Sequence, residues 1–154
     1  MSFTTRRATL DDVEKLVQLR LMLFRETKDF EGEAPPELIE ITRRYLREKI
    51  PTSQFVSWIA EVDGHMVGIS GLVFFEKPPN EANRLGLEAY IMNMYTLPQW
   101  RGRGIASVLL QNLIQFVKTT TDARRIWLHT TKDGKHVYEN AGFVFTTDDM
   151  EYLL

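Results

Sequence analysis

The first fifty residues combine one short extended segment with two stretches of helical periodicity. Residues 3–8 predict a strand, and residues 13–26 predict a helix, because apolar positions recur there every three to four residues. Thr9, with a carboxylate three residues later, supplies a start signal for that helix. A second helix opens at Pro36 and ends before Pro51. The apolar positions of the two helices are Val13, Leu16, Val17, Leu21, Phe24, Leu38, Ile41 and Tyr45.

The middle of the chain has the character of antiparallel strands. Residues 55–62 and 66–75 are strand-like runs joined by Asp63-Gly64, a strong signal for a two-residue hairpin. A loop with two prolines follows, and residues 87–96 predict another strand that is ended by Pro98. The pattern therefore predicts hairpins in the first half of a sheet.

The last third of the chain alternates between helix and strand. A broad apolar stripe from Ile105 to Val117 predicts a helix buried against the sheet, and residues 125–130 predict the next strand. Residues 131–141 predict a turn and a short helix with Gly142 at its C-cap, and residues 143–154 predict one or two final strands. This order predicts a single α/β domain, residues 1–154, with a mixed sheet.

Composition and charge narrow the function classes. The 154 residues carry 19 basic and 21 acidic side chains, a balance that argues against nucleic-acid binding. The chain has no cysteine, and its three histidines lie far apart, so we expect no metal site. No signal peptide or membrane-length apolar run is present, so we expect a cytoplasmic protein without membrane partners.

An arginine- and glycine-rich connection precedes the helix that begins at Ile105. Its sequence is Arg101-Gly102-Arg103-Gly104. The first N–H groups of a helix are unpaired and carry the positive end of its dipole, so they favour an anion, and glycines allow close approach. The segment predicts a phosphate or pyrophosphate site, with a solvated connection as the alternative. It matches neither the GxGxxG fingerprint nor a Walker loop.

Several motifs together resemble one family. Residues 101–106 fit the pattern Arg/Gln-x-x-Gly-x-Gly/Ala, which is similar to the acetyl-CoA pyrophosphate loop of the Gcn5-related N-acetyltransferases, the GNAT superfamily. The hairpin at 63–68, the strand ending in NMYT and the segment 137–143 (VYENAGF) extend the resemblance. It implies a mostly antiparallel mixed sheet of six to seven strands with four flanking helices. The sheet would be splayed between its fourth and fifth strands.

The resemblance also implies a co-substrate and its contacts. Acetyl-CoA would bind with its pyrophosphate against the peptide N–H groups at the start of the third helix and its pantetheine arm along the fourth strand. The residues implied for these contacts are Met94, Tyr95, Thr96, Arg101, Gly102, Arg103, Gly104, Ile105 and Ala106.

Catalytic roles follow from the same resemblance. Tyr138 aligns with the tyrosine that commonly protonates the leaving thiolate, and a phenol is protonated at neutral pH. The base that deprotonates the amine is open between His129, Glu88 and a water relay. Asn93 would contact the ligand or form a bulge. With no cysteine, the acetyl group must pass directly to the amine in a ternary complex.

The acceptor is less defined than the acyl donor. The segment 26–40 holds six carboxylates against one lysine, which would attract a cationic amine, although a solvated acidic loop is the more common explanation of such a run. The sequence leaves polyamine, amino acid, aminoglycoside and protein N-terminus open, and a homodimer too. Two other readings are a non-catalytic acyl-CoA sensor on the same fold and another nucleotide or phosphate binder.

Overall fold

Six strands form one mixed sheet in the computed structural model, which describes residues 2–146 and 148–154. The strand order is β1-β3-β4-β5-β6, and β2 adds a short second pairing to β4. All pairs are antiparallel except β5 with β6, which is parallel. The predicted mixed, mostly antiparallel sheet is therefore confirmed. The strands are β1 Thr4–Arg7, β2 Phe55–Val56, β3 Trp58–Val62, β4 His65–Glu76, β5 Leu87–Thr96 and β6 Arg125–Leu128.

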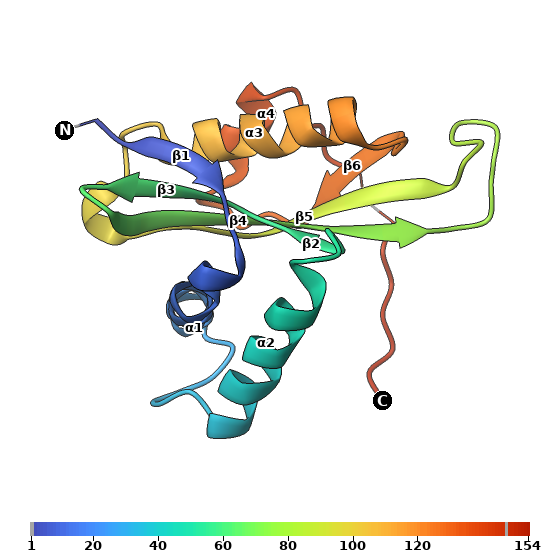
Figure 1. The fold of residues 1–154 in the computed structure, drawn as a ribbon. Helices are drawn as coiled ribbons and strands as arrows, with labels where there is room; N and C mark the ends of the chain where they lie inside the picture. The colour runs from blue at the N-terminus through green and yellow to red at the C-terminus, as the bar shows by residue number, and fades with distance from the viewer. Residues whose placement is uncertain (1, 147) are drawn as a thin grey trace.

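Four α-helices cover the two faces of this sheet, as predicted (Figure 1). Helices α1 (Val13–Thr27) and α2 (Pro36–Lys49) lie on one face, and α3 (Ile105–Thr120) and α4 (Lys135–Asn140) lie on the other. Each face buries its own apolar cluster, because the strand residues alternate between the two sides. The sheet is thus the central layer between the two pairs of helices.

The strand expected at residues 55–62 is divided in two. Ser70 is responsible: its hydroxyl donates to the carbonyl of Trp58 at 2.8 Å and accepts from the N–H of Trp58 at 3.0 Å. At the junction of β2 and β3, a side chain of β4 therefore takes the place of the backbone hydrogen bonds to β4. The carbonyl of Ser57, at the break, accepts instead from Ala8.

The strands expected within residues 143–154 were a wrong prediction. None of residues 143–146 and 148–154 belongs to a strand, and position 147 lies outside the described residues. Val144 and Phe145 are exposed, and residues 148–151 carry three carboxylates, which disfavour strand pairing. The strand expected at residues 125–130 also ends earlier, at Leu128.

The start signal at Thr9 is confirmed as a capping box that involves Asp12, followed by one turn of 3₁₀-helix before α1. Asp12 is buried and accepts two hydrogen bonds from the Arg6 guanidinium, at 2.8 and 2.9 Å, and one from the Thr9 N–H at 2.7 Å. The Arg6 hydrogen bonds oppose the effect of burial and hold the pKa of Asp12 below its ordinary value.

We expect Asp12→Asn to lower the free energy of unfolding by about 2 kcal/mol at pH 7, because it removes charge-assisted hydrogen bonds. A carboxyl whose pKa is depressed in the folded state stabilises the fold above its unfolded pKa, about 3.9 for Asp. That stability is lost as the pH falls through the folded value, so the difference between the two proteins should begin to shrink below about pH 4 and vanish only below the folded pKa. Urea denaturation at pH 7 and pH 3 measures this, with the exposed Asp11→Asn as control. A constant difference across this range would contradict it.

Candidate functional site

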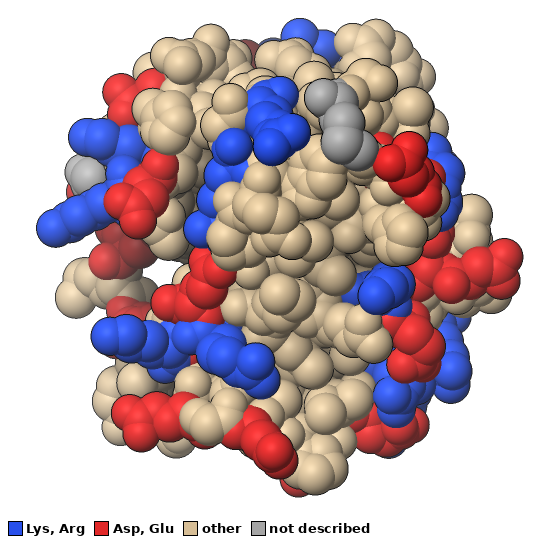
Figure 2. All heavy atoms as spheres, turned by 90° about the vertical axis from the view of Figure 1, so that its left-hand side faces the viewer, with Lys and Arg blue, Asp and Glu red and all other residues tan. Residues whose placement is uncertain are grey.

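A cleft of about 750 Å³ lies where β5 ends. Helix α1 forms one wall, the loop 97–104 and the start of α3 form the second, and α4 with the turn before it forms the third. Lys and Arg interleave with Asp and Glu on the face of the molecule that carries this loop, and neither sign dominates it (Figure 2). The cleft-lining residues discussed below are Leu23, Glu26, Met94, Tyr95, Thr96, Trp100, Arg101, Gly102, Gly104, Ile105, Ala106, Asp133, His136 and Tyr138.

The end of β5 reaches this cleft without a strand partner on one side. The parallel pairing of β5 with β6 runs from Glu88 with Arg125 to Ile91 with Leu128 and ends there. Among the described residues, positions 92–96 of β5 therefore pair with β4 alone. Met94, Tyr95 and Thr96 lie in this stretch, and its other edge is open to a ligand in the cleft, except for the Thr96 carbonyl, which accepts from Arg101 Nε.

The loop before α3 has the geometry of an anion cradle. Gly102 and Gly104 adopt φ values of +72° and +82°, in the left-handed region that favours glycine. Gly104 is the N-cap of α3 and gives it no side-chain cap, so the first N–H groups of the helix face the cleft uncapped. A Cβ at either glycine would meet no atom within 4 Å, so the space before the loop is open.

The two arginines of this loop are already engaged with the protein. Arg101 lines the cleft, donates from Nε to the Thr96 carbonyl at 2.9 Å, and forms an ion pair with Glu26 at 2.8 Å. Arg103 does not line the cleft: its guanidinium lies 4.6 Å from the ring centre of Trp100. Of the two, the structure thus brings only Arg101 to the cleft.

Glu26 on α1 also binds Tyr95 on β5. The Tyr95 hydroxyl donates to the Glu26 carboxylate at 2.8 Å. Burial of the phenol, with the hydrogen bond to Glu26, raises the pKa of Tyr95 to about 12. Glu26 therefore ties α1 to both β5 and the loop before α3, and it was singled out from the sequence only as part of an acidic run.

Tyr138 projects from α4 into the opposite side of the cleft. Its ring meets Phe143 edge-on, with centroids 6.0 Å apart, and burial is the main cause that raises its pKa to about 12. The phenol consequently stays protonated throughout the neutral range. The structure thus brings Tyr138, a candidate from the sequence, to the same cleft as the end of β5 and the start of α3.

Neither residue named as a candidate base lies among those that line the cleft. Glu88 is 8% exposed at the far end of β5, where ion pairs to Lys77 and Arg125 outweigh burial and lower its pKa. The His129 side chain is 64% exposed, and its Nδ1 lies 2.9 Å from the hydroxyl of Tyr90. The histidine that does line the cleft is His136, which the sequence had not singled out.

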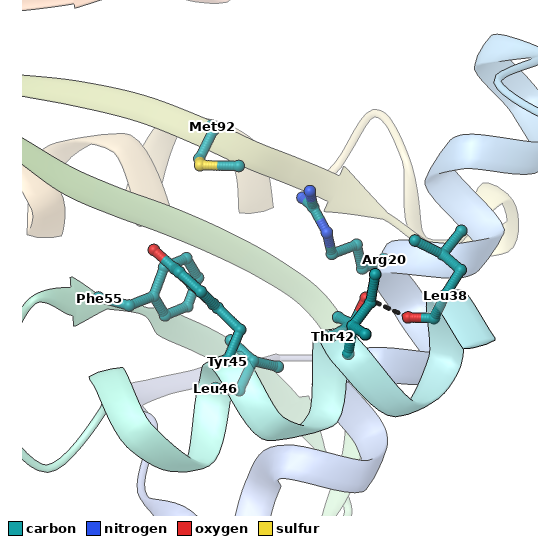
Figure 3. A pocket seen from close by; sticks show the side chains of 8 residues that line it. Arg20, Leu38, Thr42, Tyr45, Leu46, Phe55 and Met92 are labelled. Carbon is teal, nitrogen blue, oxygen red and sulfur yellow. Dashed lines mark hydrogen bonds between the residues drawn. The ribbon is translucent and has the colours of Figure 1, made fainter.

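A second, smaller cavity lies on the α1–α2 face of the sheet (Figure 3). It holds about 360 Å³, and its lining residues are Arg20, Leu38, Ile41, Thr42, Tyr45, Leu46, Phe55 and Met92. Sequence reasoning missed it, although one signal was present. Arg20 lies four residues after Leu16 and three after Val17, so it interrupts the apolar stripe of α1 with a charge.

Asn93 fixes the position of Arg20. It has φ +60°, and the β4–β5 register shifts here, so Asn93 belongs to a bulge. Its side-chain carbonyl accepts from Arg20 Nη1 at 2.9 Å. Of the two interpretations left open for Asn93, the bulge is the one that the structure shows. The hydrogen bond of its side chain is with Arg20. Gly71 makes room on the paired strand, because a Cβ there would come within 3.0 Å of Asn93.

Within residues 2–146 and 148–154, no cluster of three or more His, Cys, Asp or Glu side chains has metal-binding geometry. In the same part of the chain, no helix has both the length and the apolar character needed to cross a membrane.

The comparisons with known proteins agree with this geometry. The model of the acetyltransferase (GNAT) family matches residues 18–143. A predicted acetyltransferase of Clostridium acetobutylicum, solved with acetyl-CoA, is 31% identical, with a TM-score of 0.86 over 99% of this chain and 96% of that one. A GCN5-related N-acetyltransferase of Ralstonia eutropha JMP134 is 25% identical, with a TM-score of 0.81 over 99% of each chain.

A curated relative matches a shorter stretch of this chain. N-acetyltransferase 8 of Rattus norvegicus is 32% identical over 82 residues, which are 53% of this chain. The match covers 33% of the length of that protein, so about two thirds of the rat protein lies outside it.

Proposed function

The chain belongs to the GNAT acetyltransferase family, and on that basis we propose that it transfers the acetyl group of acetyl-CoA to a primary amine. One observation carries the proposal. The uncapped start of α3, the unpaired edge of β5 and the Tyr138 hydroxyl line one cleft. These are an anion site, a set of peptide hydrogen-bond groups and a proton donor.

The peptide groups of the chain would hold the co-substrate. We propose that the N–H groups of residues 102–106 bind its pyrophosphate, which an uncapped helix start with two left-handed glycines favours. The free edge of residues 94–96 would pair with the pantetheine arm. A donor from this edge would also stabilise the negative charge that develops on the acetyl oxygen, an effect worth several kcal/mol in acyl transfer.

In the reaction the amine nitrogen forms a bond to the acetyl carbon, the carbon–sulfur bond breaks, and the thiolate takes up the proton that the attacking nitrogen loses. We propose that Tyr138 donates a hydrogen bond to that sulfur. Its pKa of about 12 lies well above the roughly 8.5 of a thiol, so the phenol stabilises the thiolate chiefly as a hydrogen-bond donor.

Deprotonation of the amine is the less defined step. Glu88 is held in ion pairs away from the cleft, and His129 faces Tyr90 outside it. We therefore propose that water in the cleft relays this proton, which was one of the alternatives from the sequence.

A thiol-release assay with acetyl-CoA against a broad amine panel tests the proposal, together with thermal shifts in CoA, NAD and ATP. We expect CoA to raise the melting temperature more than the other two, and at least one amine to release thiol. Binding of acetyl-CoA without transfer to any amine would favour the non-catalytic sensor. A larger shift with NAD or ATP would overturn the assignment to acetyl-CoA.

A further inference from the structure

We propose that the cavity on the α1–α2 face binds the carboxylate and the apolar side chain of the acceptor, so that the acceptor is an α-amino acid with an aliphatic or aromatic side chain. This inference rests on the proposed function for its reaction, and on Arg20 and the cavity lining for its ligand. It replaces the general expectation of a cationic amine with a zwitterionic one.

Arg20 is a half-buried cation with no carboxylate in contact. Among the described residues it forms no ion pair, and its hydrogen bond goes to the neutral side chain of Asn93. Its guanidinium carbon lies over the ring of Phe24, 4.3 Å from the ring centre. Burial lowers the pKa of the guanidinium, weaker interactions with Tyr45 and Asp29 oppose that shift, and Asp29 makes no ion pair with Arg20.

An unpaired guanidinium beside an apolar cavity is costly, and a ligand anion would offset that cost. Figure 3 shows Arg20 reaching from α1 toward the strand that carries Met92. A guanidinium presents donors in a planar fork that matches a carboxylate. A single arginine balances the single charge of a carboxylate more closely than the double charge of a phosphate.

The remaining lining selects an apolar group. Apart from Arg20, the lining side chains are apolar or aromatic, except for Thr42, whose hydroxyl donates within its own helix to Leu38 at 2.7 Å. Tyr45 and Phe55 meet edge-on, with centroids 6.1 Å apart, and form an aromatic wall. A volume of about 360 Å³ suits a small ligand of this kind.

The cavity and the cleft are neighbours along two elements. Leu23 lines the cleft and Arg20 the cavity, and they lie three residues apart on α1, which places them on the same side of the helix within one turn. Met94 lines the cleft and Met92 the cavity, on either side of the bulge at Asn93. The side chains of Met92 and Met94 pack on opposite faces of the sheet, so the two sites are linked on one side through α1. In this proposal, a ligand held at Arg20 directs its α-amine along α1 toward Leu23 and the cleft.

The test compares L-phenylalanine, L-phenylalaninamide and phenethylamine as acceptors. We expect kcat/KM to be highest for L-phenylalanine. Arg20→Met should lower that value about tenfold, the effect of one charge-assisted hydrogen bond, and leave phenethylamine within about twofold. Arg20→Lys should recover part of the loss. Arg25→Met, at an exposed arginine on the same helix, is the matched control and should behave as wild type.

Equal loss for all three acceptors in Arg20→Met, or phenethylamine preferred by the wild type at equal concentrations of free amine, would overturn the proposal. The acetyl-CoA affinity of each variant separates this result from damage to the cleft. If no amine is acetylated, the proposed function fails, and calorimetric titration with L-phenylalanine still decides this inference. Binding by the wild type that Arg20→Met weakens about tenfold would support the site, and absence of binding would refute it.

Discussion

A glutamate in place of Gly104 should weaken acetyl-CoA binding about a hundredfold or more, equal to roughly 3 kcal/mol. Gly104 caps α3 with φ +82°, and the space before it is open, so the new side chain would project into the cradle without a steric clash inside the protein. Its carboxylate would take the place of the pyrophosphate at the helix start and repel it. Isothermal titration with acetyl-CoA measures the loss.

Gly104→Ala separates this effect from backbone strain. Alanine shares the cost of the left-handed conformation, about 1–2 kcal/mol, but adds neither charge nor reach. We expect it to lower the melting temperature similarly while retaining most of the affinity. If the glutamate variant kept wild-type affinity, the pyrophosphate would have to bind elsewhere.

Tyr138→Phe should lower kcat about a hundredfold and leave the dissociation constant of acetyl-CoA within about twofold, because it removes a hydrogen-bond donor near the sulfur while keeping the ring. The ring contact with Phe143 should persist, so the fold is retained. Single-turnover kinetics are the appropriate measurement, since they isolate the chemical step from product release.

Tyr152→Phe is the matched control for this substitution, because Tyr152 is 88% exposed in the C-terminal segment and does not line the cleft. It should behave as wild type. Unchanged single-turnover rates in Tyr138→Phe would leave Tyr138 with a packing role only.

The parts of the site that the sequence predicted are those with local causes. The glycine pair of the loop, the start of α3 and the Asp63-Gly64 hairpin each depend on a few consecutive residues. The same holds for the capping box at Thr9. Such features are readable without knowledge of what lies opposite them.

The parts that it did not predict depend on partners distant in the chain. Arg20 and Asn93 are 73 positions apart, and only the bulge in β5 brings them into contact. Glu88 carries a carboxylate of the kind that can act as a base, but its ion pairs with Lys77 and Arg125 neutralise the charge. The prediction of strands within residues 143–154 was also wrong, because strand propensity alone does not supply a neighbouring strand to pair with.

Both loop arginines contact other residues of the protein, and these contacts bear on which substitutions the loop can accept during evolution. Arg101 is neutralised by Glu26 and Arg103 lies over Trp100, so the loop has less free positive charge than its composition suggests. In the proposed site, recognition then falls on backbone N–H groups, which every residue except proline carries and which most side-chain replacements leave in place. Descendants of this chain could exchange either arginine at modest cost, whereas the two left-handed positions would tolerate little besides glycine.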